Sequence, residues 1–346
     1  MDRVQKDICS VIAKKELFEH LRNSSVLVTG ATGLIGSMLV KTVLEANEAY
    51  GLNIKLTGQI RDREKAVRIF GELTDRFTLS LTDSVPCNYI VHTVSPTTSK
   101  FFIEHPVETI RASVESAISV LEVARKNKAS VVYLSSMEQY GVPFTSGEQM
   151  TEEKTGIIDH LNVRSSYSES KRLCECLCAS YACEYGVDVK IARLAQTFGA
   201  GVSLSDHRMP MQFARSVVEE RDIVLHTEGK SVSNFVYLTD AIAGILLLLS
   251  RQDPGSAFNI CNDGETRSVR EIAELVADKV ANGKIAVQIE KQDNLGYAPD
   301  NTFHLNSDKL RSLGWKPEVG MEEAYRRLAE YLRAASAKKQ YTEDER

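Results

Sequence analysis

A short glycine-rich segment, Thr-Gly-Ala-Thr-Gly-Leu-Ile-Gly at residues 29–36, separates a strand pattern from a helix pattern. The apolar run at 26–28 is typical of a short buried strand, and the apolar spacing at 34–49 is typical of an amphipathic helix. A strand, a tight glycine turn and a helix in this order form the first unit of a parallel α/β sheet that binds a dinucleotide at the turn. The segment therefore predicts a fold class and a cofactor site together.

The residues of this loop have separate expected roles in cofactor binding. Gly30 allows the tight turn after the strand, Gly33 lets the backbone approach a pyrophosphate, and Gly36 lets the helix pack closely on the strand. The diphosphate would lie on the unpaired amides at the start of the helix. The predicted cofactor site also includes the neighbouring loop positions Thr32, Leu34 and Ile35.

Strand and helix patterns alternate through the first two thirds of the chain. Strand patterns follow at 53–61, 88–94, 130–136 and 187–194, and helix patterns at 64–73, 103–126 and 165–185. From about residue 199 the alternation loosens, with helix patterns at 209–220, 239–249, 269–280 and 321–334. We expect an α/β fold with a doubly wound parallel sheet (a Rossmann fold), followed by a smaller C-terminal α+β substrate-binding cap.

These patterns divide the chain into four expected segments. Residues 1–22 form a helical N-terminal extension, and 23–200 form the NAD(P)-binding Rossmann domain. The cap covers 201–334 and is partly interleaved with the first domain. Residues 335–346 are expected to be a frayed polar tail.

Composition excludes several classes of function. The 346 residues carry a net charge of −5 and no basic run, so a nucleic-acid partner is not expected. The most apolar stretch, 242–249, is too short to cross a bilayer, and 1–22 lacks an apolar signal core. Seven cysteines without framework spacing favour reduced thiols and a cytoplasmic location. Cys174 and Cys178 share a helix face that Cys176 does not, so we expect no metal site.

Tyr167 precedes Lys171 by four residues within the helix pattern at 165–185. On a helix, these positions project from one face about one turn apart. A free phenol titrates near pH ~10, and an adjacent ammonium favours the phenolate and lowers that pKa. The pair is therefore predicted to exchange a proton with a substrate hydroxyl at neutral pH.

From about residue 24 to residue 332, the chain resembles the extended short-chain dehydrogenases/reductases of the nucleotide-sugar epimerase, dehydratase and decarboxylase group. The resemblance is carried by the glycine loop, YLSSMEQYG at 133–141, the Tyr167/Lys171 pair, RLAQTFGAG at 193–201 and LGW at 313–315. Glycine loop, serine strand and Tyr/Lys pair in this order are a specific signal. Within the group, the stretches 95–110 and 162–172 look most like UDP-glucuronate decarboxylases.

The resemblance implies catalytic roles. Tyr167 would be the general base or acid, and Lys171 would bind the nicotinamide ribose and lower the pKa of the phenol. Ser136 would hydrogen-bond the reacting hydroxyl. Glu138 is either a second acid/base group or a plain loop carboxylate. Met137 stands where family dehydratases carry an aspartate, so simple 4,6-dehydration is disfavoured, although decarboxylases usually carry serine or threonine there.

On the substrate side, the resemblance places Ser95, Arg164, Gln196 and Arg208 in the binding site. Gln196 stands where the family has an asparagine.

The arginines that commonly hold the substrate diphosphate are absent from their usual positions. Ser233 occupies one of these positions, and the other falls near Thr302. A bidentate guanidinium–phosphate contact is geometrically specific, so this departure weakens the inference of a nucleotide sugar. Arg208 and Lys230 are candidate replacements.

The expected cofactor type depends on the residues after the second strand. NAD-dependent members place an acid there for the ribose hydroxyls, whereas this chain has Arg61 with Arg63 close by. A guanidinium suits a 2′-phosphate, so NADP(H) is favoured. Asp62 lies one residue further on, which leaves NAD(H) possible.

Three functions remain open at this level. The first is a redox-neutral enzyme of epimerase or decarboxylase type that oxidises a nucleotide sugar transiently to a keto-sugar. The second is an NADPH-dependent reductase of an activated keto-sugar or pentulose. The third is a nucleotide-binding scaffold without chemistry, which the retained Ser136, Tyr167 and Lys171 disfavour.

A homodimer is the expected assembly. Helices 103–126 and 165–185 resemble those that pair across the family's dimer interface. An apolar stripe on the first helix is formed by Ile110, Val114, Ala117, Ile118 and Leu121. The alternative is that this stripe packs only on the sheet.

Overall fold

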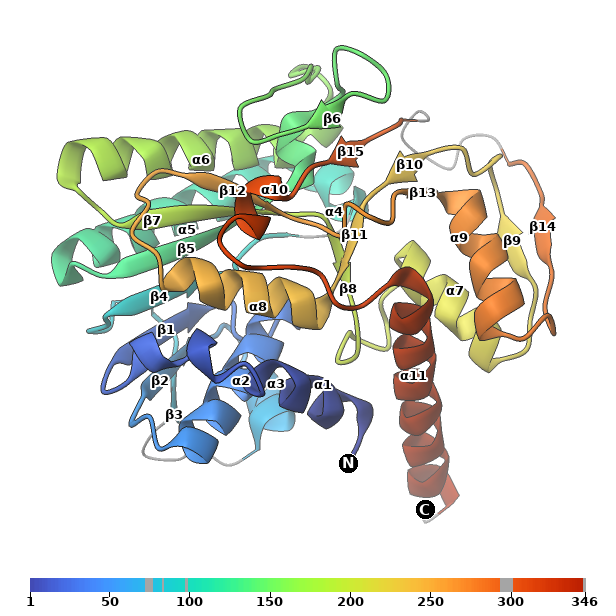
Figure 1. The fold of residues 1–346 in the computed structure, drawn as a ribbon, viewed down its shortest axis with the longest axis horizontal. Helices are drawn as coiled ribbons and strands as arrows, with labels where there is room; N and C mark the ends of the chain where they lie inside the picture. Colours follow the sequence, from blue (N-terminus) through green and yellow to red (C-terminus); the bar gives the residue numbers. More distant parts are fainter. Residues whose placement is uncertain (72–76, 83, 97–98, 293–300, 345–346) are drawn as a thin grey trace.

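A computed structural model describes residues 1–71, 77–82, 84–96, 99–292 and 301–344. At its centre is a seven-stranded sheet in the order β12-β7-β5-β4-β1-β2-β3, in which every neighbouring pair is parallel (Figure 1). The strands are β1 Ser25–Thr29, β2 Lys55–Gln59, β3 Phe77–Ser80, β4 Tyr89–His92, β5 Ser130–Ser136, β7 Val189–Leu194 and β12 Ala257–Ile260. The predicted doubly wound parallel sheet is confirmed, and β3 and β12 are strands that the patterns did not predict.

Helices cover both faces of this sheet. One face carries α4 Ser99–Glu104, α5 Pro106–Asn127 and α6 Ser166–Tyr185, and the other carries α2 Leu34–Tyr50, α3 Arg63–Phe70 and α8 Leu238–Leu249 (Figure 1). Because successive strand residues point to opposite faces, Val131 and Tyr133 of β5 join the core under α5 and α6, while Val132 and Leu134 join the core under α2 and α8. A strand buried on both sides is apolar throughout, as β5 is.

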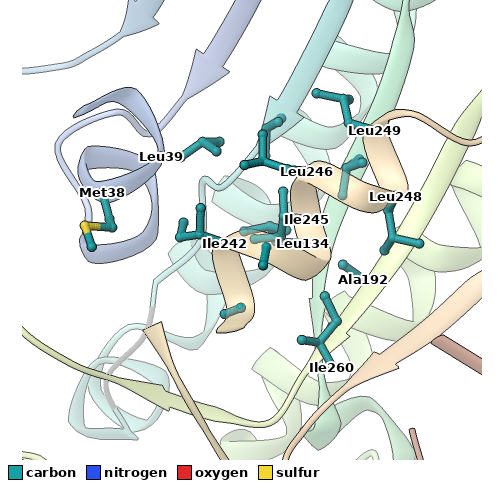
Figure 2. Close-up of a cluster of buried hydrophobic side chains, with 14 of the residues drawn as sticks. Met38, Leu39, Leu134, Ala192, Ile242, Ile245, Leu246, Leu248, Leu249 and Ile260 are labelled. Carbon is teal, nitrogen blue, oxygen red and sulfur yellow. The ribbon is translucent and has the colours of Figure 1, made fainter. Parts of the chain in front are cut away.

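Helix α8 packs on the main sheet, although its residues fall within the range expected for the cap. Ile242, Ile245 and Leu246 lie against Leu134 and Ala192 of the sheet (Figure 2). The helix is buried nearly all round, which explains why its sequence is almost entirely apolar. The next element, β12, then joins the sheet edge beside β7.

A second hydrophobic core lies beyond the sheet, among α7 Met209–Val218, α9 Val269–Leu275, the π-helical turn η5 Val276–Val280 and α11 Met321–Asp344. Two-stranded pairs surround it: β8 Gln196–Phe198 with β11 Phe235–Tyr237, β9 Ile223–Leu225 with β14 Val287–Ile289, and β10 Val232–Ser233 with β13 Arg267–Ser268. The strand β6 Gln149–Met150 pairs with β15 His304–Leu305, and α10 is Asp308–Arg311. Assignment of 201–334 as a substrate-binding cap stays a prediction.

Several element boundaries differ from the expected ones. The helix expected at 103–126 is broken at His105, because Pro106 occupies the first helical position of α5 and disfavours helical backbone in the residue before it. The last helix continues to Asp344, through most of the segment expected to be a frayed tail. The helix expected at 64–73 ends at Phe70, and its expected last two residues lie outside the described residues.

The N-terminal extension consists of α1 Arg3–Ile12 and the short helices η1 Lys15–Leu17 and η2 Glu19–Leu21. Asp7 of α1 is fully buried and accepts a hydrogen bond of 2.6 Å from the Tyr237 hydroxyl. Its carboxylate also pairs with Arg3 and Arg327 at 3.0 and 3.1 Å. These contacts tie the extension to β11 and α11. Among the described residues, no helix has both the length and the apolar character that crossing a membrane requires.

Candidate active site

The candidate residues gather where the parallel strands end. Because the sheet is parallel, the segments that follow β1, β2, β4, β5 and β7 all leave from the same edge. These segments carry Gly30, Arg61, Ser95, Ser136 and Gln196. In open α/β sheets, ligands bind at this carboxyl edge.

The glycine loop has the geometry that a pyrophosphate requires. Gly30 has a φ of +66°, and a Cβ there would lie 2.7 Å from Thr93 Oγ1. A Cβ on Gly36 would lie 2.4 Å from the Gly30 carbonyl oxygen, so the helix and the turn approach as closely as predicted. Gly33 is the N-cap of α2 and provides no side-chain cap. The amides at the start of this 17-residue helix are therefore suited to bind an anion.

The other residues predicted to bind the cofactor lie in different environments. Leu34 and Ile35 pack against the cores, so only their backbone can serve a cofactor, while Thr32 is half-buried. Arg61 is exposed and forms no hydrogen bond or ion pair with the described residues. Asp62 caps α3 by accepting a hydrogen bond of 2.9 Å from Lys65 N. Arg61 therefore has a free charged group, as does the neighbouring Arg63, which is also exposed and unpaired among the described residues.

Tyr167 is buried at the first turn of α6, with its ring stacked on Phe102 at a centroid distance of 4.4 Å. The pKa of the phenol is raised to about 12, mainly by burial and to a smaller extent by the carboxylate of Glu138, while the hydroxyls of Ser136 and Ser95 act to lower it. Three of the predicted site residues therefore surround the phenol.

Lys171 lies one turn later on α6 and is only 2% exposed. Its Nζ donates a hydrogen bond of 2.7 Å to the Leu134 carbonyl and lies 5.0 Å from the Tyr133 ring centroid and 5.7 Å from that of Tyr167. Burial lowers the pKa of this amine to about 8. The pair comes together as predicted.

The predicted lowering of the phenol pKa is wrong for this geometry. Desolvation acts on both partners, raising the pKa of Tyr167 to about 12 and lowering that of Lys171 to about 8. Desolvation therefore outweighs the attraction between the ammonium and the phenolate. The spacing of Tyr167 and Lys171 in the sequence predicts that they lie close together. It does not predict how deeply they are buried, and burial decides whether desolvation or charge attraction has the larger effect on the pKa.

The segment after β5 forms the 3-10 helix η3 Met137–Tyr140. Ser136 caps it, its Oγ accepting a hydrogen bond of 3.2 Å from Glu138 N. Glu138 lies 3.8 Å from Arg164, and burial raises the pKa of its carboxyl group. Met137 packs against the main core and accepts a contact of 3.8 Å from the Ser233 hydroxyl. This apolar position offers no acid, as the sequence predicts.

Among the described residues, neither Gln196 nor Arg208 forms a hydrogen bond or ion pair with the residues around Tyr167. Gln196 is exposed on β8. Arg208 forms an ion pair of 2.8 Å with Asp206, and its Nη1 donates to the Thr197 carbonyl. Because its charge is already balanced, Arg208 is a poor candidate for binding a substrate phosphate. Lys230 is exposed.

Sequence patterns missed the residues that hold the catalytic helix in place. Arg172 donates hydrogen bonds to the carbonyls of Gln139, Tyr140 and Gly156, which anchors the segment after η3 on α6. Glu175, four residues after Lys171, forms a buried ion pair of 2.7 Å with Arg193 of β7. The spacing from Lys171 to Glu175 was the available signal, since it places both on one helix face.

Buried cysteines and a histidine surround the lysine without forming a metal site. Cys174 and Cys178 are fully buried in the core under α5 and α6, while Cys176 is exposed. The ring of His92 contacts Thr29 Oγ1 at 2.8 Å and stacks on Tyr133. The described residues contain no group of three or more His, Cys, Asp or Glu placed to hold a metal ion.

Replacing Lys171 with methionine is expected to change how stability depends on pH. Between about pH 8 and 10.5 the folded state has lost the lysine proton and the unfolded state still binds it, so the wild-type free energy of unfolding should rise with pH through this window. In Lys171→Met this contribution is absent. The difference in free energy of unfolding, wild type minus variant, should increase by roughly 3 kcal/mol between these limits, since each pKa unit corresponds to about 1.4 kcal/mol.

Urea unfolding at a series of pH values measures this difference. The exposed Lys65→Met variant is the matched control, for which the difference should stay flat. A flat difference for Lys171→Met as well would contradict the buried, low-pKa amine.

The sequence and the fold both match known proteins. A profile of the NAD dependent epimerase/dehydratase family matches residues 26–261. The UDP-glucuronic acid decarboxylase 6 of Arabidopsis thaliana is 29% identical over 321 residues, which is 90% of this chain and 89% of the plant protein.

Solved structures agree with this assignment at the level of the fold. The UDP-N-acetylglucosamine 4-epimerase from Methanobrevibacter ruminantium M1, in complex with UDP-N-acetylmuramic acid, superimposes with a TM-score of 0.77 at 16% identity, over 91% of this chain and 99% of that one. RMD from Pseudomonas aeruginosa, complexed with NADPH, gives a TM-score of 0.68 at 20% identity, over 90% and 99%. The resemblance inferred from the motifs is confirmed: the chain belongs to the NAD dependent epimerase/dehydratase family.

Proposed function

We propose that this protein is an NAD(P)-dependent enzyme that modifies a nucleotide sugar by a redox-neutral cycle of epimerase or decarboxylase type. The observation that carries the proposal is the cluster of Tyr167, Ser136 and Lys171 at the carboxyl edge of the sheet, which the glycine loop also adjoins. A phenol, a hydroxyl and a buried amine in this arrangement are suited to moving a proton to and from an alcohol.

Residues of this chain have separate roles in the proposed cycle. When bound, the oxidised nicotinamide accepts a hydride from a sugar carbon and later returns it. For this step Tyr167 would have to be in its phenolate form: its Oη takes the proton of the hydroxyl on that carbon, which leaves a keto-sugar, and gives the proton back when the hydride returns. Ser136 Oγ orients the hydroxyl by hydrogen bonding. The stacked ring of Phe102 holds the phenol in place.

The keto-sugar acidifies neighbouring positions, so decarboxylation or inversion can follow before the hydride returns. Glu138 is the candidate second acid/base, because its raised pKa favours a carboxyl group that keeps a proton closer to neutral pH. Met137 cannot protonate a leaving hydroxyl. The protein is therefore proposed to keep the sugar's hydroxyl groups, unlike a 4,6-dehydratase.

The similarity to UDP-glucuronic acid decarboxylases makes UDP-glucuronate the first substrate to test. Purified protein would be incubated with UDP-glucuronate and a panel of UDP-, CDP-, GDP- and dTDP-sugars, and product and cofactor would be measured together. We expect product without net oxidation or reduction of the cofactor.

An NADPH-dependent reductase is the second candidate. A phenol with a pKa of about 12 is neutral at physiological pH and thus ready to donate a proton to a keto oxygen, which favours reduction. The free Arg61 also suits NADPH. One NADPH consumed per product formed would replace the first proposal with this one.

Replacing Tyr167 with phenylalanine is expected to reduce turnover by about 10²- to 10⁴-fold, the usual contribution of a positioned acid/base group. The dissociation constant for the cofactor should stay within a few fold, because the ring and its stacking on Phe102 remain. Tyr181→Phe is the matched control on the same helix, where the hydroxyl contacts only Glu122, and it should keep wild-type turnover. Wild-type activity in Tyr167→Phe would remove Tyr167 from the mechanism.

We further propose that NADP(H) is the preferred cofactor, supported by the exposed and unpaired Arg61 at the end of β2. Arg61→Gln should weaken NADP binding by about 10- to 100-fold, the range expected for a charge-assisted hydrogen bond, and leave NAD binding nearly unchanged. Arg68→Gln, an exposed site on α3, should change neither. Calorimetric titration of both cofactors measures this, and tighter binding of NAD than NADP to the wild type would overturn the preference.

A homodimer remains the proposed assembly. The apolar stripe expected on α5 divides between two environments: Ala117 and Leu121 are buried against the sheet, whereas Ile110 and Ile118 are 44% and 40% exposed. Leu173 on the adjacent α6 is also exposed, so an apolar surface is present on this helix pair. A cytoplasmic location is proposed from the seven cysteines, all of which are free thiols.

A further inference from the structure

The two-stranded ribbon of β10 and β13 places an arginine opposite Ser233. In this antiparallel pair, Ser233 is the direct partner of Arg267. Residues directly opposite each other in such a pair project from the same face of the ribbon. Ser233 Oγ contacts the Met137 sulfur at 3.8 Å, and Met137 follows Ser136 in the chain. The face that carries Arg267 is therefore turned toward the catalytic segment after β5.

The guanidinium of Arg267 makes no hydrogen bond or ion pair with the described residues. Its Nε is buried without a hydrogen bond, and the group forms no ion pair. The carboxylate of Glu271 is engaged elsewhere, accepting hydrogen bonds of 2.7 and 2.8 Å from Ser268 N and Oγ in a capping box. The Glu271 carboxylate is close enough to act electrostatically on Arg267 but forms no ion pair with it. A partly buried guanidinium without a hydrogen-bonded anion is costly, and an anionic ligand would reduce that cost.

Two other arginines of this half of the chain are already paired. Arg270 pairs with Glu274 at 2.8 Å and is exposed, and Arg208 pairs with Asp206 at the same distance. Arg267 differs from these two arginines because it forms no ion pair. Its five donors in a planar fork match the oxygens of a phosphate group.

We propose that Arg267 binds the diphosphate of the substrate, supplying from β13 the guanidinium that Ser233 does not provide from β10. This inference rests on the proposed function, since it takes the substrate to be a nucleotide sugar. Ser233 contributes a short hydroxyl, which leaves the shared face open to the longer side chain opposite. Arg267 would then be a specificity-determining residue that recognises the anion, while Tyr167 and Ser136 act on the sugar.

The test is direct binding to the protein saturated with cofactor, by calorimetric titration. The probes are whichever of UDP, CDP, GDP and dTDP binds the wild type most tightly, and the nucleoside of the same base. Arg267→Gln should weaken diphosphate binding by about 10- to 100-fold, as expected for loss of a charged hydrogen-bonding partner, and leave nucleoside binding unchanged. The exposed Arg270→Gln is the matched control and should bind both probes like the wild type.

A rescue variant separates a ligand contact from a structural effect. Adding Ser233→Arg to Arg267→Gln places the guanidinium on the opposite strand of the same face and should restore most of the diphosphate affinity. If Arg267→Gln does not fold, Arg267→Lys replaces it, and this variant should show a smaller loss because the charge remains and the fork is lost.

Three results would contradict this inference, and each has a different meaning for the proposed function. Unchanged diphosphate affinity in Arg267→Gln, with a wild type that binds nucleoside diphosphates, would overturn the role of Arg267 and leave the proposed function standing. Equal loss of nucleoside and diphosphate binding would show a structural role and also overturn it. A wild type that binds none of the four diphosphates would overturn the proposed function, and this inference with it.

Discussion

The buried amine of Lys171 is the constraint around which the catalytic region is arranged. Its ammonium has one strong acceptor, the Leu134 carbonyl at 2.7 Å, and otherwise faces aromatic rings and thiols. Desolvation therefore dominates and lowers the pKa of the amine to about 8. A group that is costly to bury persists where it has a task, and here it adjoins the phenol that is proposed to move a proton. Stability is given up at this position so that a readily titrated cation lies beside Tyr167.

The sequence predicted the fold well wherever the pattern was local. The glycine loop and the alternation of strand and helix depend on residues close in the chain, and both were confirmed. What the patterns missed depends on distant partners. The strand β12 is too short to identify until it is seen to pair with β7, and α8 is apolar because the main sheet buries it. The break before α5 had a local signal in Pro106, but the apolar period on both sides concealed it.

The sequence indicated which residues lie near one another in the candidate site, but it did not indicate the direction of their pKa shifts. Spacing placed Tyr167 and Lys171 on one face of α6, and the motif placed Ser136 beside them, but neither carried information on burial, which reverses the expected pKa shift of the phenol. The sequence also could not show which arginines are paired with a carboxylate. The ion pair of Arg208 with Asp206 has no signal in the sequence. The same holds for the position of Arg267 opposite Ser233 and for its buried Nε without a hydrogen bond.

The central claim is that the Lys171 amine is buried and has a low pKa, and an NMR titration of this side chain tests it most directly. The protein would be labelled at the lysine methylene carbons, and the Lys171 resonance would be assigned by its loss in Lys171→Met. Burial beside Tyr133 and Tyr167 predicts a titration midpoint near pH 8. A midpoint near the ordinary lysine value of 10.5 would mean that the amine is solvated, and would contradict the account of how this site handles its proton.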